Sequence, residues 1–74
     1  MKEKSAFAAL LVELRGPVSQ AASATRAGVS LRAWQLWESG RYRPGRPALI
    51  RLRERYPDRV AELDRAWAAG ASES

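Results

Sequence analysis

The sequence predicts an all-α protein, a compact bundle of five short helices. Apolar residues recur at helical spacing, Ser, Gly and Pro divide the chain at short intervals, and no segment shows the alternation typical of a strand. A chain of 74 residues is also too short for two domains, because neither half could bury a core. We therefore expect one domain over residues 1–69 and a loose C-terminal tail at 70–74.

The first helix is predicted over residues 5–15. Ser5 suits the N-cap position, and Gly16-Pro17 ends the helix because proline cannot continue its hydrogen-bond ladder. Four apolar residues at positions i, i+3, i+4 and i+7 share one face of this helix: Phe7, Leu10, Leu11 and Leu14. That face is expected to join the core.

The second and third helices are short and follow each other closely. Ser19 is the expected N-cap of an Ala-rich helix over residues 20–27, which Gly28 ends. Ser30 is the expected N-cap of a third helix over 31–39.

The last two helices follow a loop that is rich in Pro and Gly. Pro47 suits the first residue of a fourth helix over about 47–55, and a second proline opens a fifth helix over about 57–69. An apolar stripe at i, i+4, i+7 and i+11 runs into the fifth helix: Tyr56, Val60, Leu63 and Trp67. Core packing explains most such stripes, but Leu63 and Trp67 are also candidates for a dimer contact.

The third helix divides into two faces. Trp34 and Trp37 are three residues apart and share a face that is expected to enter the core. The other face mixes an arginine, an amide and two leucines: Leu31, Arg32, Gln35 and Leu36. Base edges in a major groove present acceptors, donors and thymine methyl groups, so this mixture suits DNA readout. A surface for a partner protein is the alternative.

The absence of Cys and His narrows the possible chemistry. It excludes disulfides, thiolate nucleophiles, imidazole bases and the usual ligands of zinc, copper and non-haem iron. We therefore expect no enzyme, no metal site and no cofactor. Glu38 as a catalytic carboxylate is the sharper alternative, but no second proton-transfer group stands at helical spacing beside it.

The charge of the chain favours a polyanionic partner. Thirteen Lys and Arg stand against eight Asp and Glu, a net charge of +5, and eleven of the thirteen are Arg. The segment from Arg15 to Tyr56 alone carries +7. Because the planar guanidinium fork matches phosphate and guanine, nucleic acid is the first candidate partner. A merely solvated basic face is the alternative.

No segment is long enough to cross a membrane. The apolar stretch from Ala6 to Val12 is well short of the ~20 residues required, and it lacks a signal-peptide cleavage pattern. We expect a cytoplasmic protein of a bacterial or phage-carrying cell, associated with the nucleoid. No small-molecule ligand is indicated.

Several short motifs in the middle of the chain resemble the phage-repressor, or Cro-like (Xre-type), helix-turn-helix family. They cover residues 19–44 without a gap and read Ser19-Gln20, Gly28-Val29-Ser30, Trp37-Glu38-Ser39-Gly40 and Pro44. The resemblance implies a lambda-repressor-like domain that binds DNA, in which the second helix supports the third in the major groove.

The chain departs from the family pattern inside the predicted core. Ser23 and Ala27 are small where the family usually carries leucine, and Trp34 is large where it carries Ile or Val. We interpret this as an exchange of volume, because a close-packed core tolerates changes that keep it filled. A looser core is the alternative.

The resemblance also implies an ion pair. Aligning Leu11 and Leu14 with the core leucines of the family's first helix requires a turn before Ser19 that is shorter by about two residues. On that alignment Arg15 matches the arginine that pairs with the glutamate of the Trp-Glu motif, here Glu38. We expect this pair to brace the first helix against the third.

Two groups of residues are expected to contact DNA. Those expected to read base edges are Leu31, Arg32, Ala33, Gln35 and Leu36. Those expected to hold phosphates are Ser19, Gln20, Arg41, Tyr42, Arg43 and Arg46. Arg51, Arg53 and Arg55 are expected to be solvated.

These expectations add up to a transcriptional regulator that binds double-stranded DNA. Because one such domain buries little surface, we expect a homodimer on an inverted repeat in a promoter, with its own promoter as one candidate. It would act as a repressor of phage or mobile-element type. The alternatives are an antitoxin or excision accessory factor, and a protein-interaction adaptor on the same fold.

Overall fold

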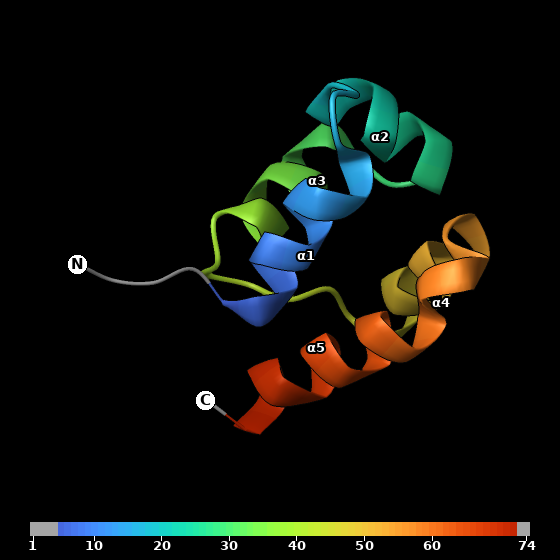
Figure 1. The fold of residues 1–74 in the computed structure, drawn as a ribbon. Helices are drawn as coiled ribbons and strands as arrows, with labels where there is room; N and C mark the ends of the chain where they lie inside the picture. Colours follow the sequence, from blue (N-terminus) through green and yellow to red (C-terminus); the bar gives the residue numbers. More distant parts are fainter. Residues whose placement is uncertain (1–4, 73–74) are drawn as a thin grey trace.

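Residues 5–72, which the computed structural model describes, form five α-helices and one short 3-10 helix, with no strand among them (Figure 1). The all-α prediction is therefore confirmed. The elements in chain order are α1 (Ala6–Arg15), α2 (Gln20–Ala27), α3 (Leu31–Glu38), α4 (Arg46–Arg55), η1 (Pro57–Arg59) and α5 (Val60–Ser72).

Three serines begin the first three helices, as expected from the sequence. The hydroxyl oxygen of Ser5 accepts a hydrogen bond from the backbone N–H three residues later, at 3.1 Å, and those of Ser19 and Ser30 do the same at 3.1 and 3.0 Å. Each bond satisfies a backbone donor that has no partner within its helix. Gly28 ends α2 with φ at 76°, a left-handed conformation that glycine adopts without steric cost.

The expected helix ends differ from the observed ones by a few residues. α3 ends at Glu38 and α4 begins at Arg46, each one residue earlier than expected, while α5 begins at Val60 after the 3-10 turn. α5 continues to Ser72, so the expectation of a loose tail from residue 70 is wrong for residues 70–72. Residues 73–74 of that tail lie outside the described residues.

The helices pack around one core. α1 lies between α3 and α5, α2 packs against α3 and α4, and α4 packs against α5 (Figure 1). All five α-helices contribute buried apolar side chains: Phe7, Leu11, Ala24, Ala27, Trp34, Trp37, Leu49, Leu52, Leu63 and Ala66. Of the residues expected in the core from the first and third helices, Phe7, Leu11, Trp34 and Trp37 belong to this cluster, whereas Leu10 and Leu14 are half-buried and pack against it.

Trp34 is the largest fully buried side chain of the domain, with no exposed area. Ser23 and Ala27 of α2 are buried too, and Ala27 belongs to the same cluster as Trp34. A large residue on α3 thus coexists with small buried residues on the neighbouring α2. This arrangement fits the interpretation that Trp34 replaces volume that α2 lacks.

The apolar stripe of the fifth helix faces inward. Leu63 has no exposed area, so the expectation that it contributes to a dimer contact is wrong. Trp67 is half-buried and packs within the chain: its indole N–H donates to the carbonyl of Pro44 at 2.7 Å. Both dimer candidates therefore hold α5 against its own domain.

Candidate nucleic-acid interface

One face of α3 is uncovered by the rest of the domain. Leu31 is 42% exposed, and Arg32 and Gln35 are exposed beside it. Leu36 is half-buried, and Ala33 is half-buried because it packs against the core. Of the five residues expected to read bases, three are therefore fully available at the surface and two are partly so.

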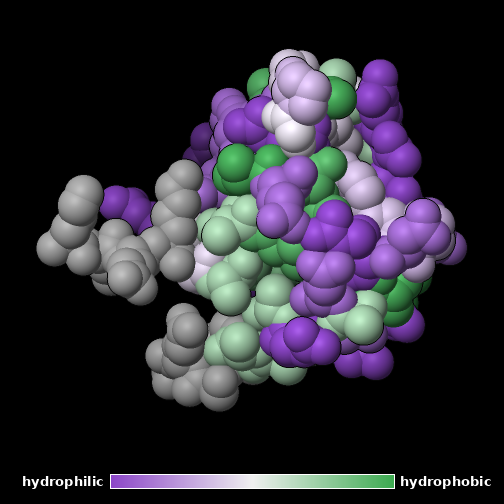
Figure 2. Space-filling view, in the orientation of Figure 1, coloured by the Kyte–Doolittle hydropathy of each residue, from purple (hydrophilic) through white to green (hydrophobic). Residues whose placement is uncertain are grey.

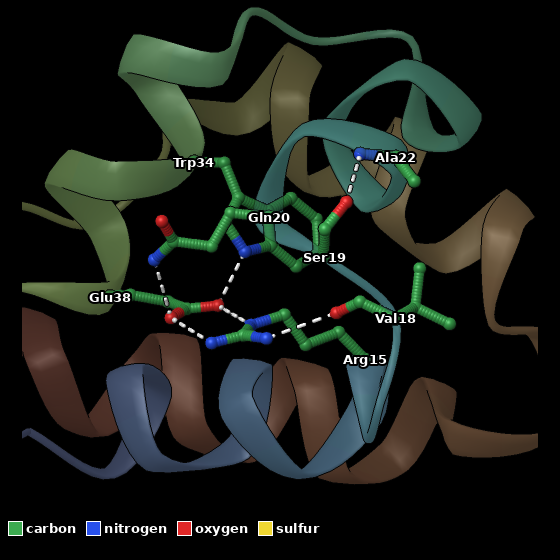
Figure 3. A network of polar contacts seen from close by, with 7 residues as sticks. All are labelled: Arg15, Val18, Ser19, Gln20, Ala22, Trp34 and Glu38. Carbon is green, nitrogen blue, oxygen red and sulfur yellow. Dashed lines mark hydrogen bonds and ion pairs between the residues drawn. The ribbon is translucent and has the colours of Figure 1, made fainter.

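A buried carboxylate at the end of α3, Glu38, fixes this helix against its neighbours (Figure 3). The expected ion pair is present, with Arg15 Nε 2.6 Å from Glu38 Oε2, and Arg15 Nη2 donates to Oε1 at 3.2 Å. Gln20 Nε2 donates to the same Oε1 at 2.9 Å, and the indole N–H of Trp34 donates to Oε2. We call these four residues the Glu38 cluster; it joins α1, α2 and α3.

The contacts of the cluster stabilise its charges. Burial alone would raise the pKa of Glu38, but hydrogen bonds from Arg15, Gln20 and Trp34, together with the positive charge of Arg15, outweigh burial and lower it. The pKa of Arg15 is raised, chiefly by its hydrogen bond to Glu38. Glu38 is thus ionised at neutral pH, with four donors around it.

The start of α2 differs from what the sequence suggested. Gln20 was expected to hold a phosphate through its side chain, but its amide nitrogen is committed to Glu38. Ser19 is exposed and uses its hydroxyl oxygen as the helix cap. The backbone N–H groups of Gln20 and Ala21 have no hydrogen-bond acceptor within α2, because the helix has no residue four positions before them.

The residues that follow α3, in the loop and at the start of α4, differ in whether they contact the rest of the domain. Arg41 and Tyr42 are exposed, Tyr42 at 60%. Arg43 instead turns towards α5: its guanidinium carbon lies 4.0 Å from the centre of the Trp67 ring, and Nη1 donates to the Trp67 carbonyl at 2.7 Å. The guanidinium carbon of Arg46 lies 6.0 Å from the centre of the same ring. Arg41 is therefore the freer cation of this loop.

The arginines divide by whether a carboxylate accompanies them. Within residues 5–72, ion pairs hold Arg15, Arg53 and Arg59, the last with both Glu13 and Glu62. Arg32, on the exposed face of α3, and Arg41, in the loop after it, have no ion pair in that part of the chain. Positive charge therefore remains uncompensated where the exposed face lies.

Three contacts around the exposed face of α3 and the loop after it are not predicted by the sequence. Trp34 and Glu38 are four residues apart on one helix, so their spacing could have suggested the hydrogen bond between them. No comparable signal links Gln20 to Glu38 or Arg43 to Trp67, because those contacts depend on how separate helices pack.

No cluster of three or more potential metal ligands occurs in the described part of the chain. None of the helices described combines the length and apolar character that a membrane span requires. No protein-family model matches the chain, and the comparisons with curated proteins and with solved structures found no match either.

Proposed function

We propose that this chain is a sequence-specific DNA-binding transcriptional regulator that inserts α3 into the major groove of duplex DNA. In this proposal α2, the connection over residues 28–30 and α3 act as a helix-turn-helix unit. The sequence resemblance to the phage-repressor family supports the same proposal.

One observation carries it: α3 exposes an arginine, an amide and a leucine on a helix whose other side is fixed. A side chain reads bases only if its helix is held in one orientation, and the Glu38 cluster together with the buried Trp34 and Trp37 holds α3. Arg32 would donate its fork to O6 and N7 of guanine, Gln35 would pair with adenine, and Leu31 would contact a thymine methyl.

Phosphate contacts would position this reading surface. Arg41 and Tyr42 lie in the loop directly after α3 and are exposed. At the other side, the uncapped N–H groups at the start of α2 suit an anion, and the positive end of the helix dipole adds to their attraction. In this revised form the side chain of Gln20 organises the site, and the backbone of α2 binds phosphate.

A domain of this size gains specificity by binding as a pair. We therefore propose a homodimer on an inverted repeat, acting as a repressor by occupying a promoter, with its own promoter as one candidate. Because Leu63 is fully buried, the contact between the two copies must use other residues.

The decisive experiment is selection of binding sites from random duplex DNA at low and physiological salt. An enriched inverted repeat is expected, and R32Q should lose enrichment at defined base positions while R65Q, which removes an exposed arginine on α5, should not. An enriched single half-site would retain DNA readout and reject the dimer.

A protein-interaction adaptor is the rival function that one observation favours, since Leu31 is an exposed leucine beside the polar Arg32 and Gln35. Absence of any enriched sequence, with weak binding that R32Q and R65Q reduce equally, would decide for the adaptor. An antitoxin or excision factor would still enrich a site, and its genomic position would distinguish it from a repressor.

A further inference from the structure

A second group of arginines lies away from the exposed face of α3. Arg26 at the end of α2 and Arg51 and Arg55 on α4 line one surface depression between these helices. Thr25 and Glu54 contribute polar groups to the same depression. In Figure 2, hydrophilic residues dominate the side of the molecule formed by α2 and α4.

The three arginines come together because of the fold. Arg51 and Arg55 are four residues apart, so they share one face of α4, and α2 packs against α4. Arg51 Nη1 also donates to the carbonyl of Gly28 at 3.2 Å, which fixes its guanidinium beside the end of α2. Arg55 lies 5.2 Å from the centre of the Tyr56 ring.

The charges in this depression are not balanced. None of the three arginines has an ion pair within residues 5–72, whereas Arg53 on the same helix has one with Asp64. Glu54 offsets one of the three positive charges, and the C-terminal ends of α2 and α4 each supply about half a negative charge. About one positive charge therefore remains, held by groups with several free N–H donors.

We propose that this depression, which we call the Arg26 site, binds a phosphate group. Guanidinium groups match phosphate oxygens through paired N–H donors, and Arg51 is already held in place by Gly28. Thr25 adds a hydroxyl donor at the rim. The phosphate comes either from a free phosphate-bearing molecule or from a DNA backbone, and the site is independent of the proposed base readout by α3.

The test compares two variants that each remove two arginines. R26Q/R55Q removes two residues of the Arg26 site and keeps Arg51, which has a structural contact. R53Q/R65Q is the matched control, because both of its arginines lie outside the depression. Thermal unfolding followed by circular dichroism checks that both variants fold.

The first measurement titrates inorganic pyrophosphate into isotope-labelled protein and follows amide NMR shifts around Gly28. Saturable binding is expected for the wild type and the control, with affinity at least about tenfold lower in R26Q/R55Q because two charge-assisted hydrogen bonds are lost. The second measurement is the salt dependence of duplex DNA binding. If a DNA phosphate is the ligand, the log–log slope becomes smaller by about 0.9 for each lost contact in R26Q/R55Q alone.

The outcomes separate the sources and the hypotheses. Weakened pyrophosphate binding with an unchanged slope identifies a free phosphate-bearing ligand, and a reduced slope identifies the DNA backbone. Equal behaviour of the two variants in both measurements overturns the Arg26 site. If no DNA binds at all, the proposed function fails, while the pyrophosphate titration still decides this inference.

Discussion

Arg15 and Glu38 lie 23 positions apart in the chain and meet through two parallel hydrogen bonds. The pair links the end of α1 to the end of α3, and the same carboxylate accepts from Gln20 and Trp34 (Figure 3). A single acidic group therefore sets how three helices meet beneath the exposed face of α3. Its contribution is positional, because a buried pair gains little net energy while the loss of one partner is costly.

Replacing Glu38 by Gln is expected to destabilise the domain. The substitution keeps the shape of the side chain but leaves Arg15 without a counter-charge. The free energy of unfolding should fall by roughly 2–4 kcal/mol, somewhat less than for a fully buried pair, because water partly solvates Arg15. Urea unfolding measures it, and DNA affinity should fall as well because α3 loses its brace.

Asp64→Asn is the control for this change. It removes the carboxylate of the exposed Arg53–Asp64 pair, whose atoms are 3.6 Å apart, and should cost less than about 1 kcal/mol. Equal stability and equal DNA affinity of E38Q and the wild type would show that the Glu38 cluster does not matter.

Acid should unfold the domain partly through Glu38. Its pKa is lowered in the folded state, so the folded protein binds this proton less readily than the unfolded chain, where a glutamate has a pKa of about 4.3. Its stabilising contribution is complete above that value and is lost as the pH falls through the lower folded pKa. Urea midpoints measured from pH 7 to pH 2 should therefore decrease below about pH 4.

The same series in two variants assigns this pH dependence. In E38Q the urea midpoint should decrease less below about pH 4 than in the wild type. E62Q removes another carboxylate whose pKa is lowered, by hydrogen bonds from Arg59. Because Glu62 is exposed, E62Q should change the pH dependence of the urea midpoint less than E38Q does. If the urea midpoint of E38Q decreases below about pH 4 as steeply as that of the wild type, other groups cause the loss of stability in acid.

Trp34→Ala is expected to cost about 3–5 kcal/mol in urea unfolding, because it opens a large cavity at a fully buried position. Trp34→Phe should cost less, since it keeps most of the volume and loses the hydrogen bond to Glu38. Leu31→Ala, at an exposed position of the same helix, should stay within about 0.5 kcal/mol of the wild type. A cost under about 1 kcal/mol for Trp34→Ala would indicate the looser core.

Local signals in the sequence predict much of this fold. Three serine caps and the left-handed Gly28 lie where the residue types require them, because capping depends on a few neighbouring residues. The helix ends shift by one to three residues, as at Ser72, because the residue types near a helix end define its last residue only to within one or two positions.

The candidate site is less predictable. Arg15 and Glu38 were paired through a family resemblance, whereas the role of Gln20 in their cluster depends on the distance between α2 and α3. The stripe containing Leu63 could equally face a core or a partner, and only the packing of α5 onto α1 decides that it is buried.

Arg32 is expected to determine specificity rather than general affinity. R32Q should weaken binding to the selected site by about tenfold to a hundredfold, the discrimination of one bidentate guanine contact, and should change binding to unrelated duplex DNA far less. Fluorescence anisotropy with both duplexes measures this, with R65Q as the variant of equal charge. Equal losses on both duplexes would reduce Arg32 to a phosphate contact.

Arg41 and Arg43 are expected to differ although they are neighbours in one loop. Arg41 is exposed without an ion pair in the described part of the chain, whereas Arg43 is stacked on Trp67 and bonded to its carbonyl. R41Q should therefore reduce the log–log salt slope of DNA binding by about 0.9, the value for one phosphate contact, on any duplex. R43Q should reduce it less, because its guanidinium must first leave Trp67 to reach a phosphate. A larger effect of R43Q would show that the Trp67 contact opens on DNA.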